Sequence, residues 1–424
     1  SVMGNTFFTT TVGVSNDELW KFLIMPFMSG LVGYGTNWLA LKMTFYPLEF
    51  VGIELVRIKD QPLGLFGWQG IIPTKAAKMA GDATDLMTTK LINVKQVFSR
   101  LEPEKFSAVM EPGLITMMDT IINETAKKYM PTIWEFLPEG VRDECVLKAL
   151  EESPKFLTGF MDDVKEHIDD IFDLKTMVIE HCVANKQLLN NVFMNCGDKE
   201  FVFIERSGFY FGFLFGLVQM GIYFAYTASW VLPAFGFLVG IATNWIALKI
   251  IFQPINPKKL CCGMCCEFQG LFLKRQDAVA EVFAKVNTQQ ILTTENMWTA
   301  ILTGPKKDNF FDLLRAHTLI FTENLAGGLK PVVIAGVGAE KFTQMKDEIA
   351  QRTMDELPKN IHYSYEYSTR ALDMEATICK AMRGLSSEEF EGVLHPVFEE
   401  DELKLIVVGG VLGAAVGFIQ LFAL

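Results

Sequence analysis

Two stretches of the chain repeat one pattern: GTNWLALKMTFYPL at residues 35–48 and ATNWIALKIIFQPI at residues 242–255. Both copies contain Thr-Asn-Trp, then Ala-Leu-Lys, and then a Phe two positions before a Pro. Self-similarity within a chain has to be considered before any single motif, because it decides how many structural units there are. The pattern therefore predicts a duplicated segment that is apolar enough for a membrane helix but carries one Asn and one Lys.

Three further landmarks follow the repeated phrase in the same order in each half of the chain. A Gln-Gly pair comes first, then a segment with helical spacing, and then a Gly-x-x-x-Gly-x-x-Gln pattern in a closing apolar stretch. They occupy residues 68–80, 172–182 and 212–219 in the first half, and residues 268–280, 372–382 and 413–420 in the second. This shared order predicts an internal duplication into two units.

The composition is that of a protein with several membrane helices and sizeable polar lobes. Hydrophobic residues make up 50% of the 424-residue chain, yet charged residues still make up 21%, which is near the usual fraction. A run of about 20 apolar residues is long enough to cross a bilayer as a helix. Four transmembrane helices are predicted, at residues 19–46, 206–227, 229–253 and 403–424.

The long segments between the predicted spans are too charged to lie in a membrane. Apolar residues recur there at three- and four-residue spacing, which is typical of amphipathic helices. Because each unit supplies two spans, both units should insert in the same orientation, as parallel repeats. The sequence thus predicts an all-α membrane protein of four transmembrane helices in two parallel repeats. The other segments are a tail at 1–18, interfacial elbows at 47–74 and 254–273, and helical lobes at 75–205 and 274–402.

Lysine and arginine are concentrated on the lobe side of the predicted spans. Cations close to a span predominate on the side that is not translocated across the membrane. The far side carries only Lys21, whereas the lobe side carries Lys42, Arg57, Lys59, Lys75, Arg206, Lys249, Lys258, Lys259, Lys274, Arg275 and Lys404. The lobes are therefore expected on the cytosolic, stromal or matrix side. The membrane is expected to be a bacterial inner membrane or an inner membrane of an organelle, thylakoid or mitochondrial.

Small and polar residues fall on one face of the first predicted span in each unit. Their spacing is four residues, from Ser29 through Gly33 to Asn37. In a bilayer, small residues let helix backbones approach closely, and an Asn amide hydrogen-bonds across the contact. One interpretation is that this face holds the two halves together, and the other is that it lines a site for an ion or a lipid headgroup. The candidate packing or ligand-lining residues are Gly33, Thr36, Asn37, Gly216 and Gln219, with Gly240, Thr243, Asn244, Gly417 and Gln420 in the second half of the chain.

The lobe-side ends of the spans and the elbows are expected at the level of the lipid headgroups. Lys42 and Lys249 follow the Asn residues by five positions, and their long side chains reach headgroups by snorkelling. The first elbow mixes apolar and charged residues, which is typical of an interfacial or re-entrant segment, although a plain link between membrane and lobe is the favoured interpretation. The candidate headgroup contacts are Lys42, Gln69 and Gly70, with Lys249, Gln269 and Gly270 in the second half of the chain.

Four cysteines are crowded into the stretch CCGMCC at residues 261–266, which has no counterpart in the first half. They lie too close together to form one tetrahedral zinc site without added ligands. Juxtamembrane cysteines are common sites of S-acylation. Candidate acylation sites are therefore Cys261, Cys262, Cys265 and Cys266, with unmodified interfacial thiols as the alternative.

Motifs of established enzyme chemistry are missing from the sequence. It contains no Walker A loop, no H-E-x-x-H and no G-x-S-x-G. The acidic residues between Asp162 and Asp173 form a stripe that is typical of a solvated helix face, with a divalent-cation site as the alternative. The net charge of −12 argues against nucleic acid as a partner. The sequence therefore predicts no enzyme, no catalytic residue, no metal site and no cofactor.

Taken together, the landmarks resemble the membrane family called domain of unknown function 445. The resemblance rests on a glycine-rich helix running into T-N-x-x-A-x-K-x-x-F-x-P, on Q-G before a basic helix, and on the closing G-x-x-x-G-x-x-Q span. It extends from about residue 19 to residue 424. It implies a helical membrane protein of bacteria and of some eukaryotic organelles, and it implies no activity. Two departures are the cysteine cluster and Leu273, which stands where the first half has Pro73.

The combined features predict a non-enzymatic integral membrane protein that acts as a scaffold or assembly subunit of a membrane or membrane complex. Its expected partners are membrane lipids and either other membrane proteins or further copies of the chain. A transporter or lipid-handling protein, with its site at the interface of the two repeats, is the alternative function.

Overall fold

The computed structural model describes residues 19–53, 61–64, 67–226, 228–259, 267–327, 330–331, 334 and 338–423. Most of these residues lie in helices, in agreement with the predicted fold class. The chain divides into two compact units, and each unit contains segments from both halves of the sequence. We call them the span unit, comprising Ser1–Met79, Cys182–Phe283 and Met382–Leu424, and the lobe unit, comprising Ala80–His181 and Ala284–Ala381.

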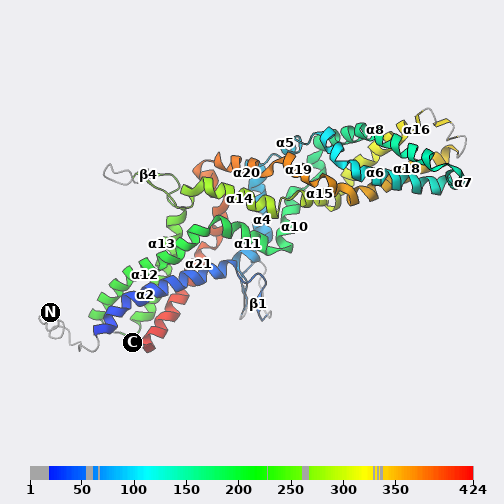
Figure 1. Cartoon of the computed structure of the whole chain (residues 1–424). Coiled ribbons are helices and arrows are strands. Elements are labelled where there is room, and N and C mark those ends of the chain that lie inside the picture. The colour runs from blue at the N-terminus through cyan, green and yellow to red at the C-terminus, as the bar shows by residue number, and fades with distance from the viewer. Residues whose placement is uncertain are drawn as a thin grey trace. The chain divides into compact units, whose positions relative to one another are not determined.

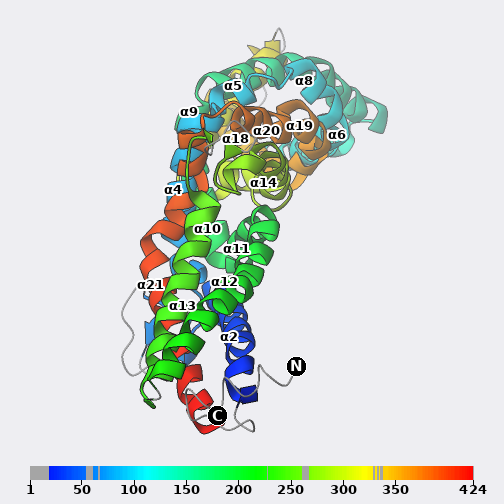
Figure 2. The same ribbon diagram turned by 90° about the vertical axis from the view of Figure 1, so that its left-hand side faces the viewer.

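Four long helices form the framework of the span unit: α2 (Leu19–Phe45), α12 (Asp198–Ala225), α13 (Val231–Phe252) and α21 (Ser387–Ala423). α2 packs along α12, and α13 packs along α21, so each half of the chain contributes one helix pair (Figure 1). The two pairs contact each other through α12 with α13, and through α2 with both α13 and α21 (Figure 2). The closest packing of each helix is therefore with the other helix of its own half.

Three described helical segments are long and apolar enough to cross a membrane: Asp198–Ala225, Val231–Phe252 and Glu402–Ile419. They contain most of three of the four predicted spans. The remaining predicted span lies in α2, whose apolar run is interrupted by residues such as Pro26, Ser29 and Asn37. Its crossing of the membrane therefore stays a prediction.

Both elbows contain short antiparallel strands, which the sequence analysis does not predict. In the first elbow, β3 (Gly67–Trp68) lies between β1 (Val51–Gly52) and β2 (Leu63–Gly64). In the second elbow, β4 (Lys258–Lys259) pairs with β5 (Glu267–Phe268). Strands of two residues are too short to show the alternation by which a strand is recognised in a sequence. The other helices of the span unit are α3 (Ile71–Thr74), α11 (Lys186–Cys196) and η2 (Leu273–Arg275).

Four further helices have residues in both units: α4 (Ala76–Leu86), α10 (Leu174–Ala184), α14 (Gln276–Gln290) and α20 (Met374–Arg383).

The lobe unit is built around four helices, two from each half: α6 (Pro103–Tyr129), α8 (Glu139–Glu166), α16 (Lys307–Ala326) and α18 (Ala339–Asn360). α6 packs on α8 and α16 packs on α18, and contacts of α6 with α18 and of α8 with α16 close a ring. Met118, Ala149 and Phe321 form part of its apolar core. The shorter elements are η1 (Met87–Leu91), α5 (Val94–Phe98), α7 (Pro131–Phe136), α9 (Ile168–Ile171), α15 (Thr294–Thr303), η4 (Ile361–Ser364) and α19 (Tyr365–Leu372).

Prolines begin some lobe helices and lie inside others. Pro103 and Pro131 occupy the first turns of α6 and α7, where the missing N–H would have no helical partner in any case. Pro154 lies inside α8, where the carbonyl of Leu150 loses its usual N–H donor. The hydroxyl of Ser153 donates to Leu150 O at 2.8 Å instead. This local replacement lets α8 continue through a proline.

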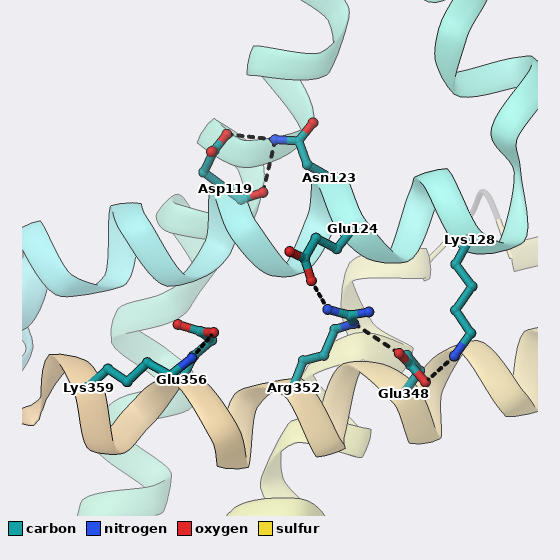
Figure 3. A network of polar contacts seen from close by, with 8 residues as sticks. All are labelled: Asp119, Asn123, Glu124, Lys128, Glu348, Arg352, Glu356 and Lys359. Atoms are coloured by element: carbon teal, nitrogen blue, oxygen red, sulfur yellow. Dashed lines mark hydrogen bonds and ion pairs between the residues drawn. The ribbon is translucent and has the colours of Figure 1, made fainter.

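Ion pairs join α6 of the first half to α18 of the second half (Figure 3). Arg352 bridges Glu124 and Glu348, and Lys128 Nζ lies 2.7 Å from a carboxylate oxygen of Glu348. Because these side chains are partly exposed, each pair is expected to contribute at most about 1 kcal/mol. We therefore attribute the stability of the ring mainly to its apolar core.

Candidate functional site

Glycines bring the backbones of α2 and α12 into direct contact. A Cβ atom added at Gly33 would lie 2.2 Å from the carbonyl oxygen of Gly208, and one added at Gly208 would lie 2.3 Å from the carbonyl oxygen of Gly33. A Cβ atom at Gly212 would lie 2.5 Å from Ser29 O. A residue with a side chain fits at these positions only if the helices move apart. This is the geometry of a small-residue contact between membrane helices.

The same kind of contact is present between α13 and α21. A Cβ atom added at Gly240 would lie 2.1 Å from Gly409 O, and one added at Gly413 would lie 2.1 Å from Gly236 O. The two helix pairs are thus packed in corresponding ways, at positions that match in the two halves of the sequence.

The closing Gly-x-x-Gln pattern continues each contact. A Cβ atom added at Gly216 or at Gly417 would lie 2.6 Å from a backbone atom of the paired helix. In the first half, the hydroxyl of Ser29 donates to Gln219 Oε1 at 2.9 Å. The side chain of Gln420 lies outside the described residues.

Asn37 and Asn244 are buried in these contacts, and each links the two helices of its own pair. Asn37 Nδ2 donates to Ile204 O at 2.7 Å, and Asn244 Nδ2 donates to Leu405 O at 2.9 Å. The interpretation that these amides hold the two halves together is therefore wrong. The four-residue stripe faces the helix that closes its own half, so the amides act within each pair.

The neighbouring threonines bond to their own helices. Thr36 Oγ1 donates to Gly33 O at 3.1 Å, and Thr243 Oγ1 donates to Val239 O at 2.9 Å. A hydroxyl that is satisfied on its own helix adds no hydrogen bond between helices. The threonines therefore contribute to the contact by their small size.

The Gln-Gly pairs close the elbows against the ends of the long helices. Gln69 is 1% exposed, and its Nε2 donates to Leu48 O at 2.7 Å. The backbone N–H of Gly70 donates to Pro47 O at 2.9 Å. A Cβ atom added at Gly70 would lie 2.8 Å from the carbonyl carbon of Phe45, so only glycine allows this close approach.

The second elbow closes in the same way. Gln269 Nε2 donates to Ile255 O at 3.0 Å, and the N–H of Gly270 donates to Pro254 O at 3.0 Å. Amides that already donate to the chain are poor ligands for a headgroup. We therefore assign the Gln-Gly pairs of both halves to closing the elbows.

The two lysines at the ends of α2 and α13 remain the candidate headgroup contacts. Lys42 is exposed, and its Nζ lies 5.7 Å from the ring centroid of Tyr46. Lys249 is half-buried in the last turn of α13. Headgroup contact by both lysines stays a prediction.

A buried ion pair, which the sequence analysis does not predict, joins the two helix pairs. Glu200, in the first turn of α12, is 4% exposed, and its carboxylate oxygens accept hydrogen bonds from Arg275 Nη1 at 2.8 and 2.7 Å. Arg275 Nη2 also lies 3.4 Å from Asp198 Oδ1. Glu200 belongs to the first half and Arg275 to the second, so the pair connects the halves at the lobe-side end of α12.

A small cavity lies beside this ion pair, where all four long helices meet. Its volume is about 40 Å³, and the residues that line it include Leu41, Cys196, Glu200, Leu248, Phe272 and Leu405. This volume is enough for about one water molecule. Burial, with the carboxylates of Asp198 and Glu200, raises the pKa of the Cys196 thiol to about 12, so this thiol is protonated and unreactive at neutral pH.

The cysteine cluster lies outside the described residues. Acylation therefore stays a prediction for Cys261, Cys262, Cys265 and Cys266. If they are acylated, hydroxylamine should release the acyl groups from the wild-type chain.

Two carboxylates of the acidic stripe between Asp162 and Asp173 each have a separate partner in the lobe unit. Asp163 Oδ2 lies 2.7 Å from His317 Nε2, and the Asp173 carboxylate accepts the N–H of Thr176 at 3.0 Å, near the start of α10. Within the described part of the chain, no group of three His, Cys, Asp or Glu residues is arranged to hold a metal ion. The divalent-cation alternative for the stripe is not supported by this arrangement, and the solvated face stays a prediction.

Similarity to a known protein covers part of the chain. Over 164 residues the sequence is 25% identical to a UPF0754 membrane protein of Nostoc sp.. This match spans 38% of the chain and 36% of the relative. No family profile and no solved structure matches the chain, so the resemblance to the domain of unknown function 445 family is not confirmed. The distant similarity to an uncharacterised membrane protein agrees with the three apolar helices of the span unit.

Proposed function

We propose that this chain is a non-enzymatic integral membrane protein with four transmembrane helices in two parallel repeats. In this proposal it organises a membrane or a membrane complex through its lobe unit. The observation that carries the proposal is the recurrence of one set of contacts in both halves. Each half has glycine backbone contacts, a buried Asn bond between paired helices, and a Gln-Gly closure of its elbow.

Close backbone packing favours a fixed frame over a moving gate. In a bilayer, helix association depends on van der Waals contact and on hydrogen bonds between helices, and both are at their strongest where the backbones touch. A transport cycle would have to move the two helix pairs against each other, and the ion pair of Glu200 with Arg275 between the halves opposes that movement. The lobe unit also combines helices of both halves around one core, which supports a single body that presents binding surfaces to partners.

Gentle extraction followed by native mass spectrometry of proteins and lipids tests this proposal. We expect the chain to leave the membrane with protein partners or with further copies of itself. A chain that stays monomeric and free of partners would contradict the scaffold role. Gly35→Val provides a matched control, because a Cβ atom there has no neighbour within 4 Å and the complex should persist. Gly33→Val, at the helix contact, should lose the complex.

A transport or lipid-handling site at the junction of the halves is a second candidate function. Two observations favour it. The cavity beside Glu200 is lined by helices of both halves. In the α2–α12 contact, outside that lining, the Oδ1 atom of the fully buried Asn37 accepts no hydrogen bond in the described part of the chain. A volume of about 40 Å³ holds about one water molecule and is too small for a lipid.

The double variant Asn37→Ala with Asn244→Ala separates the two candidate functions. Polar contacts between membrane helices are worth about 1 kcal/mol each, so we expect only a small decrease in thermal stability and an intact assembly. Ion flux into vesicles is the deciding measurement. Transport would be favoured if the wild-type chain showed ion flux and the double variant lost it while its assembly was retained. Absence of flux in the wild-type chain and in the variant agrees with a scaffold.

The sidedness of the lobes gives a further prediction. The chain has the sequon Asn123-Glu124-Thr125 in its first lobe, and we expect no glycan there after insertion into microsomes because the lobes should not be translocated. Phe7→Thr creates a second sequon at Asn5, on the opposite side of the predicted span, and serves as the positive control. A glycan at Asn123 would show that the lobes are translocated.

A further inference from the structure

The sheet of the first elbow is fixed beside the lobe-side ends of the long helices. Trp68 Nε1 donates to Met43 O in the last turn of α2 at 3.1 Å. Lys404 Nζ, at the start of the apolar part of α21, donates to Gln61 Oε1 at 3.1 Å. With the close packing of Gly70 on α2, these contacts hold the sheet at the level where the apolar helix surfaces begin.

The strand register places apolar side chains at this level. Val51 and Leu63 both pair with Trp68, from the two sides of β3. Val51 is 64% exposed and Leu63 is 65% exposed, and Ile53, next to β1, is 55% exposed. Three large apolar side chains are therefore presented outward from a sheet that hydrogen bonds hold in place.

The second elbow presents a similar combination. Phe268 occupies the position that corresponds to Trp68, is 44% exposed, and pairs with the exposed Lys258 on the neighbouring strand. An aromatic ring beside a lysine suits the boundary between acyl chains and phosphate groups. Both elbows thus combine apolar exposure with nearby cations, Lys258 in the second and Lys42 beside the first.

We propose that the two elbow sheets are membrane-interface anchors, and that the partner of Val51, Ile53, Leu63 and Phe268 is the lobe-side leaflet of a bilayer with anionic headgroups. This inference rests on the proposed membrane insertion of the long helices. The exposed elbow residues continue the apolar surface of those helices at the depth where tryptophan and other amphipathic groups are enriched. The anchors fix the depth of the span unit and the distance of the lobe-side helix ends from the membrane surface.

Photocrosslinking to lipid tests the anchors in the full chain. A benzophenone amino acid replaces Leu63, Val51 or Phe268 in protein reconstituted into vesicles of phosphatidylcholine and phosphatidylglycerol. The same amino acid replaces Leu214 on α12, which is 56% exposed, as the membrane control. Phe136 in the lobe unit, which is 83% exposed, is the control outside the membrane. Adducts are identified by mass spectrometry, and each variant is first shown to elute like the wild-type chain in gel filtration.

We expect lipid adducts at the three elbow positions and at position 214, and none at position 136. The anchor would be overturned if position 214 formed lipid adducts but the elbow positions formed none or crosslinked only to protein. That result would leave the proposed membrane insertion intact. Absence of lipid adducts at position 214 as well would overturn the proposed membrane insertion itself. The two failures are thus distinguishable.

Discussion

Gly33→Ala should lower the free energy of unfolding by about 1–3 kcal/mol, whereas Gly35→Ala, two residues along the same helix, should leave it unchanged or raise it slightly. The two changes add the same methyl group to α2. At Gly33 the new Cβ atom would lie 2.2 Å from Gly208 O, whereas at Gly35 it has no neighbour within 4 Å. Alanine is also the better helix former by about 1 kcal/mol, so only the helix contact can make the first variant less stable.

Thermal unfolding in one detergent, followed by tryptophan fluorescence and gel filtration, measures this difference. Gly240→Ala tests the second helix pair in the same way, because its Cβ atom would lie 2.1 Å from Gly409 O. Gly221→Ala, on α12 with no neighbour within 4 Å, is a second control. Equal stability of Gly33→Ala and Gly35→Ala would show that α2 and α12 do not pack through their glycines.

The glycine stripe shows how far the sequence alone determines the contact. The four-residue spacing of Ser29, Gly33 and Asn37 predicts that these residues share a helix face, and they do share one at the α12 contact. Spacing describes a face but does not identify the helix opposite it. For this reason the sequence allows the interpretation that the contact joins the two halves, whereas the structure places it inside each half.

The elbows show a second limit. The sequence shows that a Gln-Gly pair recurs after each Pro, but its role depends on a chain reversal that brings Gln69 back to Leu48 and Gly70 back to Phe45. No periodic pattern encodes such a reversal, and the strands that support it are only two residues long. From the sequence alone, the position of the motif near the membrane surface predicts a headgroup contact instead.

The ion pair of Glu200 with Arg275 was missed for a different reason. The two residues are separated by most of two long helices in sequence, and Arg275 has the same sequence signature as the other lobe-side cations. What distinguishes Arg275 is its partner, the buried carboxylate of Glu200, and burial is a tertiary property. One available signal was an acidic residue just before an apolar segment, since an unpaired carboxylate near a membrane is costly.

Glu200→Gln should destabilise the folded chain by about 3–5 kcal/mol, the usual cost of removing one partner from a buried ion pair. The change preserves the shape of the side chain but leaves the Arg275 guanidinium without its main counter-charge, in a side chain that is only 23% exposed. Asp198→Asn is the matched control: Asp198 is 59% exposed and 3.4 Å from the same arginine, so its loss should cost no more than about 1 kcal/mol.

Two readouts separate the ion pair from a general loss of packing. The double variant Glu200→Met with Arg275→Leu removes both charges and fills the site with apolar groups, so it should recover much of the stability lost in Glu200→Gln. Cys196, which lines the adjoining cavity, should react with maleimide faster in Glu200→Gln than in the wild-type chain, because the lost carboxylate no longer raises the pKa of the thiol and the cavity opens to water more often. If Glu200→Gln and Asp198→Asn were equally stable, the pair would be dispensable, and the junction of the halves would depend on helix packing alone.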